Sequence, residues 1–195
     1  MKIGETIYAR DRADFRRWLE SNFRTSREVW LVFPTVASGE IGVSYNDAVE
    51  EALCFGWIDS TAKALDERHG VRRFTPRKAG SGYSRPNIER LIWLEERGMI
   101  HESIRESVLP LIRAPYVFPE DIISEIRRDE LAWKIFESFT EPYRRIRVAY
   151  IDAARDRPEE FRKRLASFIK KTRDGRIITG YGGIDKYYVG ENRNG

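Results

Sequence analysis

The sequence is poor in the residues that carry redox and metal chemistry. Only one cysteine and two histidines occur in 195 residues. A single cysteine excludes a disulfide within the chain and fits a reducing compartment. Because Cys54 lies in an apolar stretch, we expect a buried, unreactive thiol. His69 and His101 stand far apart with no cysteine or second histidine beside either, which argues against a zinc site, and no cofactor is expected.

Long apolar runs are also missing. The longest, residues 52–58, is far shorter than the roughly 20 residues that cross a bilayer, so no membrane insertion is expected. The N-terminal residues lack the apolar core of a signal peptide. Both observations predict a cytoplasmic protein. The sequence likewise shows no GxSxG, HExxH, Walker or dinucleotide-binding motif, so it favours none of the common catalytic classes.

The pattern of apolar residues predicts strands early in the chain and helices later. Alternating or continuous β-prone runs predict strands, and three- and four-residue spacing predicts helices. Strands are predicted at residues 6–9, 29–33, 57–65 and 71–75, and helices at residues 11–23, 44–56, 84–98, 101–112, 119–127, 130–139, 143–154 and 158–172. Ser44 with Asp47 resembles a capping box, and Gly56 is the expected C-terminal glycine of that helix.

These elements predict an α+β protein. Residues 1–98 would form an α+β domain with a small, mostly antiparallel sheet and flanking helices, and residues 99–176 a helical C-terminal part. Residues 177–195 lose helical periodicity and end polar, which predicts a mobile or loosely docked tail.

Basic residues gather in two blocks. Residues 68–90 hold seven Lys or Arg against one acid, and residues 144–176 hold twelve against five. Charge of one sign in a short stretch can concentrate an anionic partner. The first block begins in the predicted hairpin of residues 57–75 and continues through the loop after it, so this region is the first place to look for a site.

The hairpin has two possible registers. Symmetric pairing about its turn places Asp59 opposite Arg77 and Lys63 opposite Arg73, while a shift of one residue remains an alternative. Opposed like charges destabilise a strand pair. The symmetric register therefore requires either nearby acids or an anion between the two cations.

The loop after the hairpin adds donors for an anion. Gly80, Ser81 and Gly82 lead to Ser84, a predicted N-cap, and backbone amides at a helix N-terminus favour phosphate or carboxylate. Trp57 and Tyr83 are candidate stacking faces. The predicted ligand-binding residues are Trp57, Asp59, Arg73, Arg77, Lys78, Tyr83, Ser84 and Asn87.

Each of these residues also has a purely structural interpretation. Trp57 and Phe74 can belong to the core, and Asp59 can serve as the ion-pair partner of an arginine. The basic residues can form a solvated strand edge that prevents unwanted pairing. Ser84 can act only as a cap.

The central motifs resemble those of the YdeI/OmpD-associated, or bacteriocin-protection, family. The resemblance rests on residues 56–60 (GWIDS), residues 73–78 (RFTPRK), Ser84 and Asn87, with Thr172-Arg173 and Arg176 near the end. Tyr83 stands where the family would have Trp. The family names imply protection against bacteriocins or cationic peptides, and they imply no reaction, cofactor or catalytic residue.

Three functions follow from the sequence. The first is a cytoplasmic stress-protection protein that binds an anionic small molecule or nucleic acid at the basic hairpin and loop. The second is a protein-interaction module with Trp57, Phe74 and Tyr83 as an aromatic docking surface. The third is an enzyme acting on a phosphorylated or nucleotide-like molecule, with Asp59 as the acid/base candidate.

Overall fold

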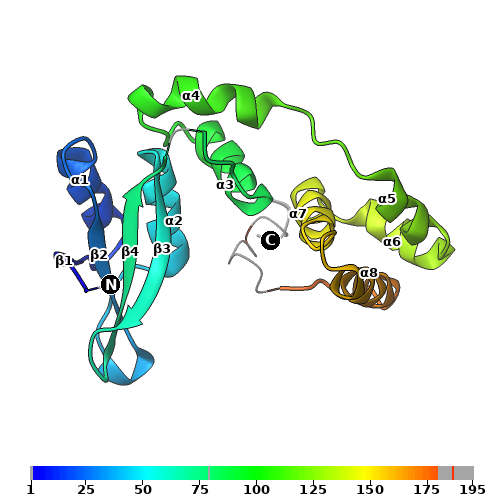
Figure 1. Ribbon diagram of the computed structural model, residues 1–195, viewed down its shortest axis with the longest axis horizontal. Helices are drawn as coiled ribbons and strands as arrows, with labels where there is room; N and C mark the ends of the chain where they lie inside the picture. Colours follow the sequence, from blue (N-terminus) through cyan, green and yellow to red (C-terminus); the bar gives the residue numbers. More distant parts are fainter. Residues whose placement is uncertain (1, 79, 180–185, 187–195) are drawn as a thin grey trace, which may run out of the picture. The chain divides into compact units, whose positions relative to one another are not determined.

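The chain forms two compact units. A computed structural model describes residues 2–78, 80–179 and 186 (Figure 1). The first unit comprises Met1–Tyr83 and Arg90–Ile112, and the second comprises Ser84–Glu89 and Arg113–Gly195. An α+β part is followed by a helical C-terminal part, so the predicted fold class is confirmed.

The first unit is built on a four-stranded sheet. Its elements are β1 (Thr6–Tyr8), α1 (Arg12–Asn22), β2 (Val29–Pro34), the 3₁₀ helix η1 (Val36–Ser38), α2 (Tyr45–Cys54), β3 (Trp57–Ala64) and β4 (His69–Pro76). The two further helices α3 (Arg85–Glu96) and α4 (Glu102–Arg113) lie mostly in this unit. The strand order is β1-β2-β4-β3. Only β1 and β2 run parallel, so the sheet is mixed and mostly antiparallel.

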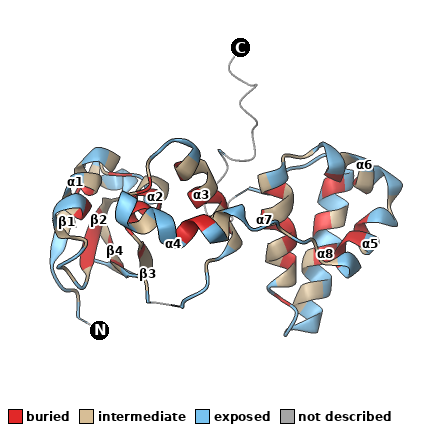
Figure 2. Ribbon diagram, turned by 90° about the horizontal axis from the view of Figure 1, so that it is seen from above, coloured by how far each residue is buried: buried red, intermediate tan, exposed pale blue. Residues whose placement is uncertain are grey.

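The main core lies on one face of this sheet. Phe15 and Leu19 of α1 pack with Phe74 of β4 and with the apolar side of α2, and all are buried. Figure 2 shows buried stretches, in red, on α2 and within the sheet. The opposite face carries a smaller cluster of Trp30 with two valines. Burying one face more deeply than the other is typical of antiparallel sheets, and it leaves the second face available to polar side chains.

Caps fix where the first helices begin and end. The Asp11 side chain accepts the amide of Asp14 at the start of α1, and Ser44 does the same for Asp47 at the start of α2. The predicted capping pair and the C-terminal Gly56 are confirmed. Gly56 has φ +70°, and an added Cβ would lie 3.1 Å from Ile104, so both conformation and space favour glycine.

The hairpin of β3 and β4 is not symmetric. The observed pairs are Trp57 with Pro76, Ile58 with Thr75, Asp59 with Phe74, Ala62 with Arg72 and Lys63 with Val71. The predicted opposition of Asp59 to Arg77 and of Lys63 to Arg73 is therefore wrong. The hairpin is centred on Glu67, one residue earlier than predicted, which moves the partner of Lys63 by two residues, and a β-bulge between Asp59 and Ala62 shifts the partner of Asp59 by one more.

The bulge also changes which face later side chains occupy. Strand side chains alternate between faces, so one extra residue reverses the alternation beyond it. Before the bulge, Trp57 and Asp59 share the core face with Phe74. After it, Lys63 lies on the opposite face, where its Nζ is 5.9 Å from the centre of the Trp30 ring. Lys63 is opposite Val71 and not opposite Arg73, so the two cations are not direct cross-strand partners.

The second unit is helical over its described residues. Its helices α5 (Glu120–Arg127), α6 (Glu130–Ser138), α7 (Glu141–Asp152) and α8 (Pro158–Arg173) surround a core with Phe136 and Phe168 in edge-to-face contact. The predicted helix 143–154 begins earlier, at Glu141, because Pro142 is tolerated in a first turn. No helix in residues 2–78 or 80–179 is long and apolar enough to span a membrane.

The start of the predicted tail is attached to α7. The amide of Ile178 donates to the Tyr143 hydroxyl at 2.9 Å, and its carbonyl accepts a hydrogen bond from Arg147. Residues 180–185 and 187–195 of that predicted tail lie outside the described residues.

His69, at the start of β4, contacts two carboxylates in the first unit. Its Nδ1 lies 2.9 Å from Asp66 and its Nε2 lies 3.1 Å from Glu40. These contacts, that to Asp66 first, raise the pKa of His69 above its ordinary value of 6.5. The protonated ring therefore joins the hairpin turn to the segment after η1.

This geometry predicts a pH dependence. Because the folded-state pKa is raised, the stabilisation is complete below the unfolded-state pKa and is lost as the pH rises through the folded-state pKa. We expect an NMR titration of His69 with a midpoint above 6.5, and a lower midpoint in a Glu40→Gln variant. A His69→Gln variant assigns the resonance. A midpoint at or below 6.5 would contradict the bridging geometry.

Candidate functional site

A basic groove lies in the first unit, where the segment between α1 and β2 meets the end of β4. Its volume is about 780 Å³. The basic groove is lined by Arg24, Thr25, Ser26, Arg27, Ile58, Arg73, Thr75, Pro76, Arg77, Lys78 and Ser81. Five of these side chains are cationic and four carry a hydroxyl group, so the described lining is a set of donors for an anion.

The sheet explains how the strand residues reach this groove. Arg73 and Thr75 are two positions apart on β4, so they point to the same face. Ile58 of β3 is paired with Thr75 and joins them. This face is opposite to the one that packs on α1 and α2. The antiparallel pairing of β2 with β4 also brings the segment before Val29 close to the segment after Phe74.

Arg77 is held in place by the loop that follows it. Its Nη2 donates to the carbonyl of Gly82 at 2.7 Å, and its guanidinium lies 3.7 Å from the centre of the Tyr83 ring. Ser81 closes the loop by donating its hydroxyl to the carbonyl of Lys78 at 2.7 Å. A stacked, hydrogen-bonded arginine loses little further rotamer freedom when it binds a ligand.

The charges of the basic groove are only partly compensated. Arg73 donates to Glu28 at 2.7 and 2.5 Å, and this contact lowers the pKa of Glu28. Arg24, Arg27 and Lys78 are exposed. No ion pair of these three occurs among residues 2–78 and 80–179, so the groove keeps a positive potential that attracts anions.

Asp59 does not belong to this groove. It lies on the core face, where its Oδ2 accepts from Arg72 at 2.7 Å and from the Tyr45 hydroxyl at 2.9 Å. The Arg72 guanidinium also lies 4.3 Å from the centre of the Tyr45 ring. Asp59 and Arg73, both predicted ligand residues, are thus on opposite faces of the sheet. Asp59 is therefore the ion-pair partner of Arg72, and a ligand-binding or acid/base role for it stays a prediction.

The predicted aromatic docking surface is absent. Trp57 is 1% exposed and Phe74 is fully buried. The indole Nε1 of Trp57 donates to the carbonyl of Phe23 at 3.1 Å, which satisfies its polar atom inside the core. Trp57 therefore cannot serve as a stacking face for a ligand, and Tyr83 is the one residue of the three that is partly exposed.

Ser84 and Asn87 belong to the second unit. The Ser84 carbonyl accepts the amides of Asn87 and Ile88 at 3.0 Å, which starts α3. A ligand-binding role for these two residues stays a prediction. Of the eight predicted residues, the basic groove brings together Arg73, Arg77 and Lys78.

The segment of residues 24–27, which supplies Arg24 and Arg27, was not among the residues predicted from the sequence. A signal was present, because RTSR combines two arginines with two hydroxyl groups directly before a predicted strand. Antiparallel pairing of that strand with the predicted strand 71–75 would have placed this segment beside the basic hairpin.

Cys54 is buried, as predicted. Burial is the main reason why its pKa is raised to about 12, so its thiol stays protonated at neutral pH. The part of the chain that the structure describes contains no group of three or more side chains suited to a metal ion.

A mixed sheet with a basic groove, followed by a helical unit, defines the architecture of this protein, and family models agree with both parts. Residues 7–107 match the family described as Domain of unknown function (DUF8412), and residues 115–175 match the family described as Bacteriocin-protection, YdeI or OmpD-Associated. The chain belongs to the DUF8412 family and carries the YdeI/OmpD-associated segment in its helical part.

The family resemblance is thus confirmed, with its match in the helical part. The motifs of residues 56–60 and 73–78 fall within the DUF8412 match, whereas Thr172 and Arg173 fall within the other. Searches of curated proteins and of solved structures found no match.

Proposed function

We propose that this protein binds a small anion, containing phosphate or carboxylate groups, in the basic groove of its first unit. The observation that carries the proposal is the convergence of five cationic and four hydroxyl-bearing side chains on one groove of about 780 Å³. Sites of this volume are in the usual range for small-molecule ligands.

The geometry favours an anion with several oxygen atoms. Arginine presents its donors in a planar fork that matches phosphate and carboxylate. Arg73 and Arg77 are both held by protein contacts, while Arg24 and Arg27 are exposed at the mouth of the groove. The held arginines would orient the ligand, and the exposed ones would add charge-assisted contacts to it.

A small anion fits this groove better than a nucleic acid. Single-stranded nucleic acids are bound mainly by stacking of bases on aromatic rings. Trp57 is buried, and the face of Tyr83 is covered by the guanidinium of Arg77. The groove offers charge and hydroxyl groups without an open stacking face.

The test is calorimetric titration with pyrophosphate and with citrate. We expect a double variant, Arg24→Gln with Arg27→Gln, to bind at least about tenfold more weakly, because two charge-assisted contacts of about 1 kcal/mol each are lost. Raising the salt from about 50 to about 300 mM should weaken wild-type binding, since the groove is open to solvent.

A matched control separates contact from net charge. Arg127→Gln with Arg128→Gln removes the same charge from two exposed arginines of the second unit. Equal losses in both double variants, or no loss in the groove variant, would overturn the proposal. An octathymidylate that binds more tightly than pyrophosphate would show that the ligand is a nucleic acid instead.

The biological role is proposed from the family description alone. That description names protection against bacteriocins, and we propose that anion binding serves such a protective role in the cytoplasm.

A further inference from the structure

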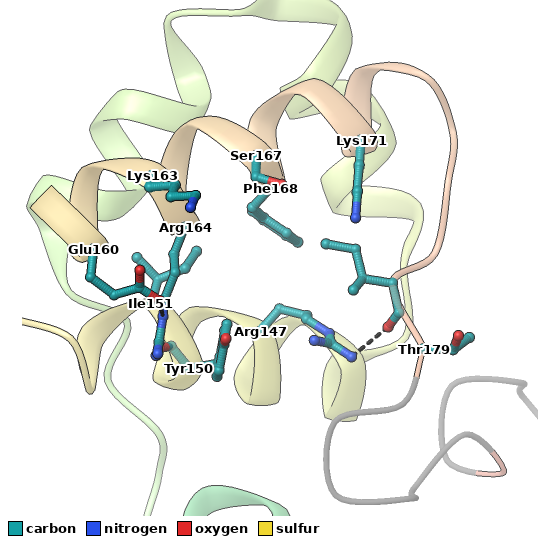
Figure 3. Close-up of a pocket in the computed structure, with 11 residues that line it drawn as sticks. Arg147, Tyr150, Ile151, Glu160, Lys163, Arg164, Ser167, Phe168, Lys171 and Thr179 are labelled. Atoms are coloured by element: carbon teal, nitrogen blue, oxygen red, sulfur yellow. Dashed lines mark hydrogen bonds and ion pairs between the residues drawn. The ribbon is translucent and has the colours of Figure 1, made fainter.

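A second cavity lies within the second unit, between α7 and α8. Its volume is about 450 Å³ (Figure 3). Residues 147, 150 and 151 of α7 face residues 160, 163, 164, 167, 168 and 171 of α8, and residues 178 and 179 complete the lining. We name this cavity the α7–α8 pocket; it shares no residue with the basic groove.

Helical spacing places a row of polar side chains along the pocket. Lys163, Ser167 and Lys171 follow one another at four-residue steps, so they lie on one face of α8. Eight residues of helix span about 12 Å, so the two lysines lie toward opposite ends of the pocket. Figure 3 shows the side chains of Lys171 and Phe168 pointing into the space between the helices.

The floor of the pocket is apolar. Ile151 is 1% exposed and Phe168 is 2% exposed, and both belong to the core of the unit. Ile178 adds a third apolar side chain, and its backbone is tied to α7 through Tyr143 and Arg147. An apolar floor below a polar rim is the usual arrangement of a small-molecule site.

The rim is positively charged. Glu160 is the only acid in the described lining, and it is paired with Arg164 at 2.7 Å, which lowers the pKa of Glu160. Arg164 is fixed further by a bond to the carbonyl of Tyr150 and by stacking 3.9 Å from that ring. Because this pair is neutral overall, the electrostatic potential of the pocket is positive and is set by Lys163, Lys171 and Arg147.

We propose that the α7–α8 pocket binds a small organic anion with an aromatic body and a carboxylate or sulfonate group. The aromatic body would pack on Ile151 and Phe168, and the anionic group would be held by Lys163 or Lys171. Burial of the apolar body supplies most of the affinity, at about 25 cal/mol per Å². The lysines select against uncharged molecules of the same shape.

The probe is 1-anilinonaphthalene-8-sulfonate, which combines an aromatic body with one sulfonate. Binding to the full chain is followed by its fluorescence. N-phenyl-1-naphthylamine, which has the same aromatic body without the charge, is the matched neutral probe. We expect a Lys163→Gln, Lys171→Gln variant to bind the sulfonate about tenfold more weakly and the neutral probe as wild type does.

Two further variants locate the binding. Ser167→Trp fills the pocket and should abolish binding of both probes, while Lys170→Gln, an exposed neighbour outside the lining, should change neither. The variant Arg24→Gln with Arg27→Gln should leave sulfonate binding unchanged. Circular dichroism confirms that each variant is folded.

The proposal is overturned by no sulfonate binding to the wild-type chain, by unchanged sulfonate affinity in the double lysine variant, or by undiminished binding in Ser167→Trp. Equal losses of both probes in the double lysine variant would also overturn it, because charge recognition would then be absent.

Discussion

Replacing Glu51 with glutamine is expected to lower the free energy of unfolding of the first unit by about 3 kcal/mol. The Glu51 side chain is 1% exposed and accepts bonds from Arg12 at 2.6 Å and from Arg16 at 2.9 Å. Removing its charge leaves two arginine side chains, which are 30% and 28% exposed, with weaker partners. Breaking a buried ion pair on one side is costly for this reason.

Urea unfolding followed by tryptophan fluorescence measures this effect. Four of the five tryptophans lie in the first unit, so the signal reports mainly on that unit. The control is Glu20→Gln, which removes the same charge from an exposed partner of Arg16 and should cost at most about 0.5 kcal/mol. Equal free energies of unfolding for the Glu51 and Glu20 variants would contradict the prediction, because they would show that water solvates Arg12 and Arg16 when Glu51 loses its charge.

The variant Glu89→Ala is expected to destabilise the second unit by about 3 to 5 kcal/mol. The Glu89 side chain is 2% exposed and receives two bonds from Arg145, at 2.7 and 2.9 Å, and two from Arg85, at 2.7 and 2.5 Å. Loss of this carboxylate leaves both arginines, at 17% and 10% exposure, without their shared counter-charge.

Thermal unfolding monitored by far-ultraviolet circular dichroism suits this helical unit. Glu141→Gln is the matched control, because Glu141 also binds Arg145 but is 69% exposed, so its loss should cost at most about 1 kcal/mol. A double variant, Glu89→Met with Arg145→Met, should recover part of the loss, since an apolar pair leaves fewer charges buried. A double variant less stable than Glu89→Ala would contradict this account.

Much of the fold could be predicted because local signals agreed with one another. The pairing of Ser44 with Asp47 marked the start of α2. Gly56 marked its end, because glycine readily adopts the positive φ that is observed there. The bulge in β3 could not be predicted. Its residues, Ser60 and Thr61, are as suited to a regular strand as to an extra turn of the backbone, so only the packing of neighbouring strands decides the register.

The candidate site was predicted in part for the same reason. Arg73, Arg77 and Lys78 were found because their charges are adjacent in the sequence, and the structure places them in one groove. Asp59 was included by proximity along the chain, although the alternation of strand side chains sends it to the other face. Arg24 and Arg27 were missed because only the pairing of β2 with β4 brings them near.

The bulge between Asp59 and Ala62 has a consequence for how the protein behaves in a crowded solution. Within the described residues, β3 forms one edge of the sheet, with backbone groups that another chain could pair with. A bulge interrupts the regular spacing of those groups and increases the local twist. An incoming strand would lose its ladder of hydrogen bonds at this point. The same bulge that turns Lys63 to the other face of the sheet therefore protects this edge against aggregation.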